Sequence, residues 1–512
     1  MLITDWIPRA LARHPDAPAI IDGERRFTYE TCARETARLA WALRGRVPAG
    51  ARVGLLMENC AELLFAQYAV VSLGAIAVPI NVAFRAQSVE HILRDAGVSV
   101  VIGRGQALGR HQQVLEAASE LSLVVQDGAA PALAKETWFW SALGQPARLE
   151  LPSGAPEQST ALLLYTTGTT GRRKGVRLSH TNLMAATRNM NQVMRIGDGE
   201  REVVSLPLTH SFGLGRTRCL FETRGTVIIE SGLDRPDKVL MSCLRHQATG
   251  LASVPAGFAI FLSRYAALLT QCASCLRYVE IGSAPMPLAH KQALMALLPR
   301  TRIYMHYGLT EASRSTFLEF HAAQDALESA GTPPATVRLK IIDQQGREVP
   351  PGTIGTVCIA GDTVMQGYWN RPDETASALV DGWLVTGDLG SLDAQGCLTL
   401  WGRTQDLINV GGHKVLAREV EDVLANHPLV EESAAVGVRD PLDIAGEVVK
   451  AFVVRKDEGL SAEDLKRHCL KHLEPWKVPA IVSFVPRLPK TGSGKLQKQL
   501  LADAPDAMAR AV

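Results

Sequence analysis

Short apolar runs alternate with helical patterns along the first 150 residues of the chain. The helical patterns are at residues 29–44, 61–73 and 88–95. The β-branched or apolar runs are at residues 53–57, 77–80 and 98–102. Such alternation is typical of layered α/β structure in which most strands are parallel. At 512 residues the chain is long enough for more than one domain.

One apolar run, residues 63–80, has nearly the length of a membrane span. It contains Gln67, Ser72 and Gly74, and Pro79 argues against one continuous helix. We therefore interpret the run as a buried helix that leads into a strand. The N-terminus lacks the basic and apolar regions of a secretory signal.

Composition excludes several classes of protein. Hydrophobic residues make up 46% and charged residues 21% of the chain, which is ordinary for a soluble globular protein. A net charge of +2 with a pI near 8.1 gives no electrostatic footprint for nucleic acid. The nine cysteines are scattered, and only Cys272 and Cys275 have C-x-x-C spacing. We interpret them as reduced thiols and expect a cytoplasmic protein.

A loop rich in glycine and threonine follows the apolar run 161–165. Its residues Thr166, Thr167, Gly168, Thr169, Thr170, Gly171 and Lys174 offer main-chain amides, hydroxyls and a cation. Such groups can surround the oxygens of a polyphosphate. The loop is not a Walker loop, because Arg173 stands where the second glycine would be needed. A glycine-rich surface turn is the alternative.

Three strand-like runs between residues 200 and 330 end in polar or small residues. His210 follows the first run, Gly282 to Pro285 follow the second, and Tyr307 to Glu311 follow the third. In open α/β sheets ligands bind beyond the carboxyl ends of strands, so these ends predict a pocket. Tyr307 could stack on a base and Glu311 could hold Mg²⁺. His210 alone could equally be a satisfied buried histidine.

From residue 335 the pattern changes to short strands. Strand-like runs at 337–342, 355–359 and 397–401, separated by turn residues, predict a small β-subdomain. Within it Asp388, framed by glycines, could accept both hydroxyls of a ribose, although a turn aspartate is the alternative.

A small α+β module follows a boundary near residues 404–406. It has a helical pattern at 417–427, strand-like runs at 433–438 and 448–454, and a helix opened by Ser461 with Asp464 as a capping box. Near its end Lys495 stands in a glycine-containing loop, which by itself could be a solvated turn.

Together these motifs, in this order, resemble the adenylate-forming superfamily of acyl- and aryl-CoA synthetases, luciferases and peptide-synthetase adenylation domains. The resemblance covers nearly the whole chain. It implies an α/β fold with a large N-terminal domain of layered sheets plus a small β-subdomain, residues 1–404, and a C-terminal α+β lid, residues 405–512. It also implies a two-step reaction in which a carboxylate attacks the α-phosphate of ATP and a thiol then displaces AMP.

The resemblance implies roles for individual residues. The catalytic residues would be Lys495, Thr310 and His210, and the metal ligand would be Glu311. ATP or AMP would be bound by Thr166, Thr167, Gly168, Thr169, Thr170, Gly171, Lys174, Gly282, Ser283, Ala284, Pro285, Tyr307, Gly308, Thr310, Asp388 and Arg403. The acyl pocket would comprise His210, Phe212, Val254, Gly257 and Gly308. Gly411 and Gly412 would line the CoA passage, and Gln405 would be the hinge.

The sequence departs from the family pattern at two of these motifs and narrows the acid at a third. Arg173 stands where proline is usual, and Gln405 stands where the hinge is usually Asp or Lys. His210 replaces the aspartate that would pair with an α-ammonium, which argues against an amino acid and favours a hydrophobic carboxylate. Arg216 and Arg218 are expected outside the pocket as ordinary helix charges, although one could bind a polar tail.

We expect an acyl-CoA ligase that uses ATP, Mg²⁺ and coenzyme A on a small-molecule carboxylic acid. An acyl-AMP ligase that loads the thiol of an acyl carrier protein is the alternative, although the insertion common in that family is absent. A nucleotide-binding protein without catalysis is a third reading, disfavoured by the joint presence of Glu311, Asp388, Arg403 and Lys495. We expect no nucleic-acid partner, no membrane span, and a monomer or homodimer.

Overall fold

The computed structural model describes residues 1–146, 148–152, 155–167, 173–230, 232–441, 446–490 and 496–502. The chain forms two compact units, one of Met1–Arg338 with Ile359–Leu384 and one of Leu339–Cys358 with Val385–Val512. A mobile lid that begins at residue 405 stays a prediction.

A seven-stranded sheet lies in the N-terminal part of the first unit. Its strands in spatial order are β7 (Glu136–Phe139), β6 (Leu123–Asp127), β5 (Val98–Arg104), β3 (Arg52–Leu56), β4 (Ile76–Pro79), β8 (Thr160–Thr167) and β9 (Arg173–Ser179). All neighbours are parallel except β8 and β9. The helices of this region are α1 (Trp6–Arg13), α2 (Tyr29–Leu43), α3 (Ala61–Ser72), α4 (Ala86–Ala96), α5 (Gly105–Arg110), α6 (Gln112–Ala117) and the 3-10 turn η1 (Trp140–Ala142). The predicted alternation is confirmed.

The long apolar run forms a core helix followed by a strand, as expected. Every residue of α3 is buried, and Gly74 with φ of +73° makes the left-handed turn that leads toward β4. Among the residues that the structure describes, no helix is both long and apolar enough to cross a membrane.

An eight-stranded sheet carries most of the predicted strand ends. Its order is β15 (Thr316–Glu319), β14 (Arg302–Tyr307), β13 (Tyr278–Ile281), β12 (Gly250–Ser253), β10 (Arg201–Val204), β11 (Thr226–Ile229), β1 (Pro18–Asp22) and β2 (Arg25–Thr28). The six central strands are parallel, and only the outer pairs β14–β15 and β1–β2 are antiparallel. The carboxyl ends of β10, β12, β13 and β14 therefore share one edge.

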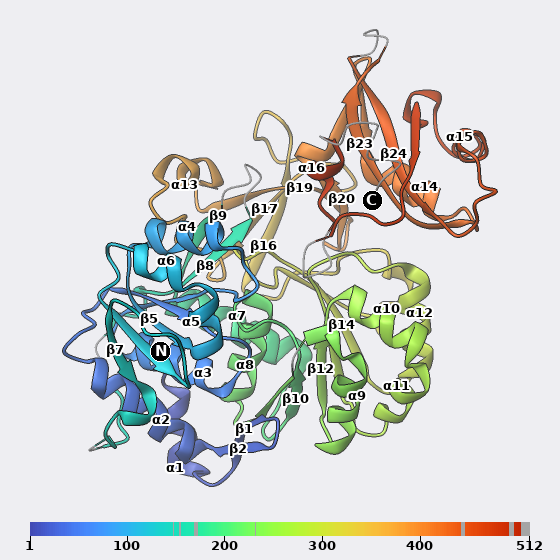
Figure 1. Ribbon diagram of the computed structural model, residues 1–512. Coiled ribbons are helices and arrows are strands. Elements are labelled where there is room, and N and C mark those ends of the chain that lie inside the picture. Colours follow the sequence, from blue (N-terminus) through green and yellow to red (C-terminus); the bar gives the residue numbers. More distant parts are fainter. Residues whose placement is uncertain are drawn as a thin grey trace. The chain divides into compact units, whose positions relative to one another are not determined.

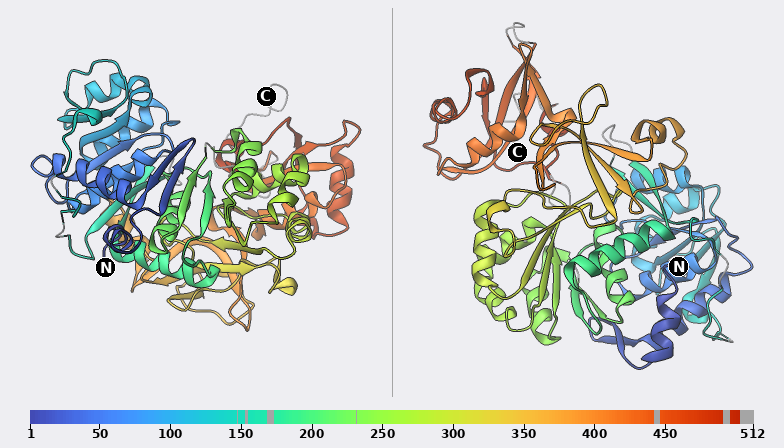
Figure 2. Two further views of the ribbon diagram at one scale, coloured as in Figure 1. Left: turned by 90° about the horizontal axis from the view of Figure 1, so that it is seen from below. Right: turned by 180° about the vertical axis from the view of Figure 1, so that it is seen from behind.

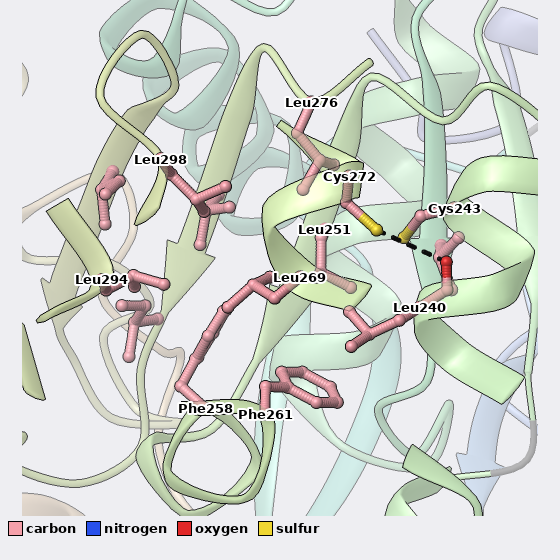
Figure 3. Packing of buried hydrophobic residues seen from close by; sticks show 14 of the residues in the cluster. Leu240, Cys243, Leu251, Phe258, Phe261, Leu269, Cys272, Leu276, Leu294 and Leu298 are labelled. Atoms are coloured by element: carbon pink, nitrogen blue, oxygen red, sulfur yellow. Dashed lines mark hydrogen bonds between the residues drawn. The ribbon is translucent and has the colours of Figure 1, made fainter. Parts of the chain in front are cut away.

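Helices cover this sheet and close its core. They are α7 (His180–Met194), α8 (Ser211–Glu222), α9 (Pro236–Arg245), α10 (Pro255–Arg264), α11 (Ala266–Cys272) and α12 (Leu288–Leu297), with the 3-10 turns η2 (Gly232–Asp234) and η3 (Gln324–Ala326). Helices α9 to α12 lie along one side of β10, β12 and β14 (Figure 1). The same helices, coloured green to yellow-green, lie beside these strands in both views of Figure 2. Figure 3 shows how Leu240, Phe258 and Leu294 meet there in a buried cluster.

The thiols of the predicted C-x-x-C pair lie in the same core. Cys272 is fully buried and donates to the carbonyl oxygen of Leu240 at 3.5 Å (Figure 3), while Cys275 donates to the carbonyl of Cys272 at 3.3 Å. All nine cysteines are free thiols, so none of them forms a disulfide. The expectation of reduced thiols is confirmed.

The remaining elements build the β-subdomain and the C-terminal module. The five-stranded sheet has the order β16 (Val337–Ile342), β17 (Gly355–Gly361), β19 (Trp383–Leu392) and β18 (Leu379–Val380), with β20 (Leu398–Arg403) beside β19 and helix α13 (Pro372–Ala378) before β18. The module contains β21 (Leu407–Val410), β22 (His413–Leu416), β23 (Val430–Arg439), β24 (Glu447–Arg455), β25 (Ile481–Phe484), α14 (Ala417–Ala425), α15 (Ala462–Leu470), α16 (Lys498–Ala502), η4 (Thr404–Asp406) and η5 (Pro475–Lys477). Ser461 and Asp464 form the predicted capping box of α15.

Two neighbouring residues of α9 test the core. Leu240 is fully buried, whereas Met241 is 58% exposed. We expect Leu240→Ala to lower the free energy of unfolding by about 2–5 kcal/mol, because it removes buried methyl groups and leaves a cavity. The matched control Met241→Ala should change it by less than about 0.5 kcal/mol. Chemical denaturation followed by circular dichroism measures both, and equal effects would contradict the assigned core.

Candidate functional site

The predicted strand ends of the eight-stranded sheet come together at one edge. Strand β13 pairs in parallel with β12 and β14, so that Ile281 lies beside both Ser253 and Met305. Val254 follows β12 and Gly282 to Pro285 follow β13, while Tyr307 ends β14 and Gly308 to Glu311 follow it. Residues from three separate stretches thus face a common region, as predicted from the order of strands and turns.

The turn after β13 has an unusual backbone. Ser283 has φ of +78°, in the left-handed region that non-glycine residues rarely adopt. Ser283 and Pro285 are exposed, and Ala284 between them is half-buried. Gly282 has no room for a side chain, because a Cβ there would lie 2.1 Å from Cε1 of His306. The turn therefore presents exposed backbone and small side chains, which suits close approach of a flat ligand.

Glu311, the predicted metal ligand, is held by a residue that the sequence analysis missed. The hydroxyl of Tyr368 donates to Oε1 of Glu311 at 2.9 Å, and the backbone amide of Met365 donates to the Glu311 carbonyl at 2.8 Å. Glu311, Thr310 and Tyr307 are all half-buried. The carboxylate is thus oriented and still within reach of a ligand.

The same tyrosine reaches the strands that flank the predicted phosphate loop. Thr166 on β8 lies opposite Lys174 on β9, and Thr167 lies opposite Arg173. The ammonium of Lys174 lies 5.3 Å from the centroid of the Tyr368 ring and pairs with Glu374. The loop residues Gly168, Thr169, Thr170 and Gly171 lie outside the described residues. Tyr368 therefore connects the base of the predicted phosphate loop to Glu311.

Arg173, which departs from the family pattern, has a contact of its own. Its guanidinium lies 3.8 Å from the centroid of the Phe84 ring, and its carbonyl accepts a hydrogen bond from Nε2 of His91 at 2.9 Å. Burial lowers the pKa of Arg173. The arginine thus anchors the start of β9, where a proline could offer no cation–π contact.

His210 and the predicted acyl-pocket residues gather at the start of α8. His210 is the N-cap residue of α8 and is exposed, so it is not the satisfied buried histidine of the alternative reading. Desolvation by the surrounding protein nevertheless lowers the pKa of His210, and the positive charge of Arg173 lowers it further. Phe212 and Val254 belong to one buried apolar cluster with Leu206 and Ala252.

The two glycines of the predicted acyl pocket are tightly placed. Gly257 is buried in the first turn of α10, and its amide donates to the carbonyl of Val254 at 2.9 Å. A Cβ at Gly308 would lie 2.5 Å from the backbone nitrogen of Arg314. Of the five predicted residues, Phe212 and Val254 therefore share one cluster, and Gly257 is bonded to it.

A buried ionic layer adjoins this cluster, and the sequence analysis did not find it. Glu280 on β13 is fully buried and lies 2.8 Å from Nδ1 of His306, 2.9 Å from Nη1 of Arg216 and 3.2 Å from Nε of Arg314. The His306 ring in turn meets the Phe212 ring edge-on at 4.8 Å. Burial alone raises the pKa of Glu280, but Arg216 and Arg314 outweigh it and hold the pKa well below its usual range.

Arg216 and Arg218 are not the ordinary helix charges that were expected. Arg216 is fully buried and donates to both oxygens of Glu202, from Nε at 2.7 Å and from Nη2 at 2.5 Å. Glu202 also accepts the hydroxyl of Tyr278 at 2.8 Å. Arg218 is 3% exposed. The expectation was wrong because both faces of α8 are covered, which its own sequence does not reveal.

Asp388 and Arg403, the predicted ribose residues, lie side by side in the second unit. They are directly opposite each other on the antiparallel strands β19 and β20, and Nε of Arg403 lies 3.0 Å from Oδ1 of Asp388. The side chain of Asp388 is 9% exposed and that of Arg403 is 31% exposed. A carboxylate fixed by a cation in this way can accept hydrogen bonds from a diol.

Gly411, Gly412 and Gln405 lie in the second unit. Gly411 and Gly412 form the two-residue turn between β21 and β22, with φ of +57° and +90°. Positive φ at both positions is what such a hairpin turn requires, so the glycines have a backbone reason as well as a predicted role. Gln405 is exposed in η4. Lys495 lies outside the described residues.

The donor set around Glu311 suits Mg²⁺ bound together with a nucleotide. Within the described part of the chain, no group of three or more His, Cys, Asp or Glu side chains could enclose a metal ion. Mg²⁺ usually binds through one or two carboxylates plus substrate phosphates and keeps several waters. A single oriented carboxylate such as Glu311 fits this pattern.

Comparisons with known proteins cover nearly the whole chain. Residues 7–369 match the AMP-binding enzyme family, and residues 419–495 match the C-terminal domain of AMP-binding enzymes. The chain is 34% identical to a feruloyl-CoA synthase of Amycolatopsis sp, over 96% of this chain and 97% of the relative. It is 31% identical to a long-chain-fatty-acid–CoA ligase of Escherichia coli O6:H1, over 98% and 94%. The crystal structure of the anthranilate CoA ligase AuaEII in complex with anthranoyl-AMP has a TM-score of 0.88 at 27% identity, over 100% and 98%.

Removing Arg216 should destabilise the protein in a pH-dependent way. Arg216→Met leaves Glu202 and Glu280 buried without their main counter-charge, which costs about 3–5 kcal/mol of unfolding free energy at pH 7. In the native protein Glu280 has a depressed pKa, so its contribution is present above the ordinary value of 4.5 and is lost as pH falls through the folded pKa. Without Arg216 that pKa rises, so the deficit should shrink between pH 7 and pH 4.5. Denaturant titrations at both pH values measure it.

The matched control is Arg264→Met, at an exposed position in the last turn of α10. It should change the free energy of unfolding by less than about 0.5 kcal/mol at either pH. A deficit of equal size at pH 7 and pH 4.5 for Arg216→Met would show that the loss of packing, and not the unpaired carboxylates, dominates.

Proposed function

The chain belongs to the AMP-binding enzyme family, and we propose that it joins a compact hydrophobic carboxylic acid to coenzyme A in two steps. Its family domains and its relatives make it an AMP-forming CoA ligase. In the first step the acid attacks the α-phosphorus of ATP and displaces pyrophosphate, which leaves an acyl-adenylate. In the second step the thiol attacks the acyl carbon and displaces AMP.

The observation that carries this proposal is the connection from Lys174 through Tyr368 to Glu311. The ammonium of Lys174 lies against the Tyr368 ring, and the Tyr368 hydroxyl donates to Glu311. The cation that we assign to the phosphates and the carboxylate that we assign to Mg²⁺ thereby contact the same side chain, although one lies on β9 and the other follows β14. A triphosphate needs both at once, because one group must hold its terminal phosphates while the other supports the metal.

The chemistry needs positive charge, because a carboxylate must approach a phosphate. Two unit charges 4 Å apart repel each other by about 4 kcal/mol at an effective dielectric constant near 20. Mg²⁺ held by Glu311 would supply part of the compensation at the phosphates. We assign the rest to Lys174 on the terminal phosphates, to Thr310 at the α-phosphate and to Lys495 between the carboxylate and the α-phosphate.

We assign the adenine and the ribose to different residues. Ser283, Ala284 and Tyr307 would contact the adenine, since an exposed turn with a positive φ and an aromatic ring suit a flat base. Asp388, fixed by Arg403 at 3.0 Å, would accept the ribose hydroxyls. In the second step Gly411 and Gly412 would border the passage of the pantetheine arm, with Gln405 as the hinge of the lid.

A compact acid is favoured by what stands behind the acyl pocket. Phe212 and Val254 form the apolar cluster that would contact the acyl group, and His306 meets the Phe212 ring directly. Behind His306 stands Glu280, whose ion partners all lie within 3.2 Å. The layer is well filled, because a Cβ at Gly215 would lie 2.7 Å from Nη1 of Arg314.

A long alkyl chain would have to pass through this layer. Removing one partner from a buried ion pair costs about 3–5 kcal/mol, whereas an acid that ends in front of His306 leaves every partner of Glu280 in place. The acid should therefore end in front of His306. An aromatic ring or a short branched chain satisfies this limit, whereas a straight chain of sixteen carbons does not.

Lys495 should be required for one half-reaction only. We expect Lys495→Ala to abolish adenylate formation, measured by ATP–pyrophosphate exchange, because the cation between carboxylate and α-phosphate is lost. Thioester formation from supplied acyl-AMP should be retained within about threefold. Lys490→Ala is the matched control in the same segment, since Lys490 pairs with Glu432 and has no assigned role. Equal loss of both half-reactions in Lys495→Ala would refute the assignment.

A panel of acids tests the limit set by His306. With ATP, Mg²⁺ and CoA present, benzoate and cinnamate should give kcat/KM values for AMP release at least about tenfold above palmitate, a difference of about 1.4 kcal/mol. His306→Ala should reduce this preference, because it vacates the space beside Gly282. A preference for palmitate in the unaltered protein would refute the compact pocket. Replacing CoA by a phosphopantetheinylated carrier protein tests the alternative acceptor.

A further inference from the structure

A cavity of about 410 Å³ lies among helices α1, α7 and α8 of the first unit. Its walls include Trp6 and Arg9 of α1, Met184 of α7, and Arg218 and Phe221 of α8. None of its lining residues belongs to the residues assigned to ATP, the acid or CoA. The nucleotide and acyl chemistry therefore leaves this cavity without a function.

Arg218 lines the cavity and is buried without a counter-ion among the residues that the structure describes. Its side chain is only 3% exposed, and within the described part of the chain neither Nε nor Nη1 has a hydrogen-bond acceptor. Burial lowers the pKa of Arg218 to about 10, which still leaves the group positively charged at neutral pH. Arg216, two residues earlier, differs because it is paired with Glu202 and Glu280. Buried charges are normally paired, so an unpaired guanidinium calls for an anion.

Two further buried donors near Arg218 also lack partners. The Tyr68 hydroxyl and Nε1 of Trp6 are buried, and no acceptor for either occurs among the described residues. Burial raises the pKa of Tyr68, and the positive charge of Arg218 opposes that shift. The Trp6 and Tyr68 rings meet edge-on at 4.7 Å. Of these groups, the Arg218 guanidinium and the Trp6 indole line the cavity.

The other charges on the cavity wall add to its positive character. Arg9, Arg13 and Arg224 line it together with a single acid, Glu222. Glu222 already accepts a hydrogen bond from Nδ2 of Asn191 at 3.0 Å and lies 3.9 Å from Nε of Arg188. Arg224 is paired with Asp198. The acid of the wall is therefore engaged away from Arg218, and the cavity favours an anion.

The rest of the wall is apolar and aromatic. Leu2, Ile3, Met184 and Phe221 line the cavity, and the Phe221 ring stacks on Trp6 at 4.0 Å with an interplanar angle of 14°. A bare inorganic anion would leave these surfaces in contact with water. A ligand with an anionic head and an apolar body would satisfy both the donors and the walls.

We propose that this cavity is a second binding site, for a monocarboxylate with an aliphatic or aromatic body. The carboxylate accepts hydrogen bonds from Arg218, and the body lies along Phe221 and Met184. Arg218 and Phe212 both belong to α8, and His210 is the N-cap residue of the same helix. Occupation of the cavity would therefore fix the helix that carries the predicted acyl-pocket residues. The site stands on its own donors and cavity and does not depend on the proposed reaction.

Binding is tested with octanoate and two control compounds. Octanol lacks the carboxylate, and inorganic phosphate lacks the apolar body. Octanoate should raise the melting temperature of the full chain in the absence of ATP, whereas octanol and inorganic phosphate at the same concentration should not. Arg218→Met should weaken octanoate binding, measured by calorimetry, by at least about tenfold, since a hydrogen bond to a charged group is lost. Equal stabilisation by octanol, or no shift with octanoate because water alone hydrates Arg218, would overturn the proposal.

The location and the fold of the variant need separate measurements. Crystals soaked in 8-bromooctanoate should show the anomalous signal of bromine among α1, α7 and α8; a signal confined to the region of Phe212 and Val254 would overturn the proposal. Without ligand, Arg218→Met should melt no lower than the unaltered protein, because it removes an unpaired buried charge. The exposed Arg264→Met should leave binding unchanged.

Discussion

One buried carboxylate, Glu280, holds together the elements from which the candidate site is built. It lies on β13 and pairs with His306 of β14, with Arg216 of α8 and with Arg314 beyond β14. A fully buried charge is tolerated only when cations and hydrogen bonds compensate its loss of hydration. Glu280 therefore constrains the positions of its partners. It constrains in the same way the turn at Gly282, the aromatic residue Tyr307 and the start of α8.

This constraint explains why the site combines small and charged residues. His306 occupies the space beside Gly282, and Arg314 occupies the space beside Gly215, so neither glycine can carry a side chain without displacing a member of the ionic layer. The layer limits the depth of the predicted acyl pocket, and its rigidity positions Phe212 against the His306 ring. In the same way Tyr368 fixes Glu311 on one side while its ring accommodates Lys174 on the other.

Local sequence patterns predicted many of the helices and strands. The strands at 53–57 and 98–102 and the helix at 61–73 lie within two residues of their predicted bounds, because each is an apolar run that ends at polar or glycine residues. Ser461 caps α15 as expected, since a capping box depends on residues three positions apart. Between 106 and 156 the pattern was weak, although α5, α6, β6 and β7 lie there. The elements of this region are short, and a short element offers too few residues for a period to stand out.

The order of strands, turns and polar residues by itself determined the fold class, the family and the candidate residues at the strand ends. Only the tertiary structure decided which charges are buried, because burial depends on what packs against a helix from distant parts of the chain. Arg216 and Arg218 look alike in the sequence. Arg216 is paired with Glu202 and Glu280, whereas Arg218 faces a cavity and has no counter-ion within the described ranges. Tyr368 likewise gains its place between Lys174 and Glu311 from pairing across the fold, which no local spacing encodes.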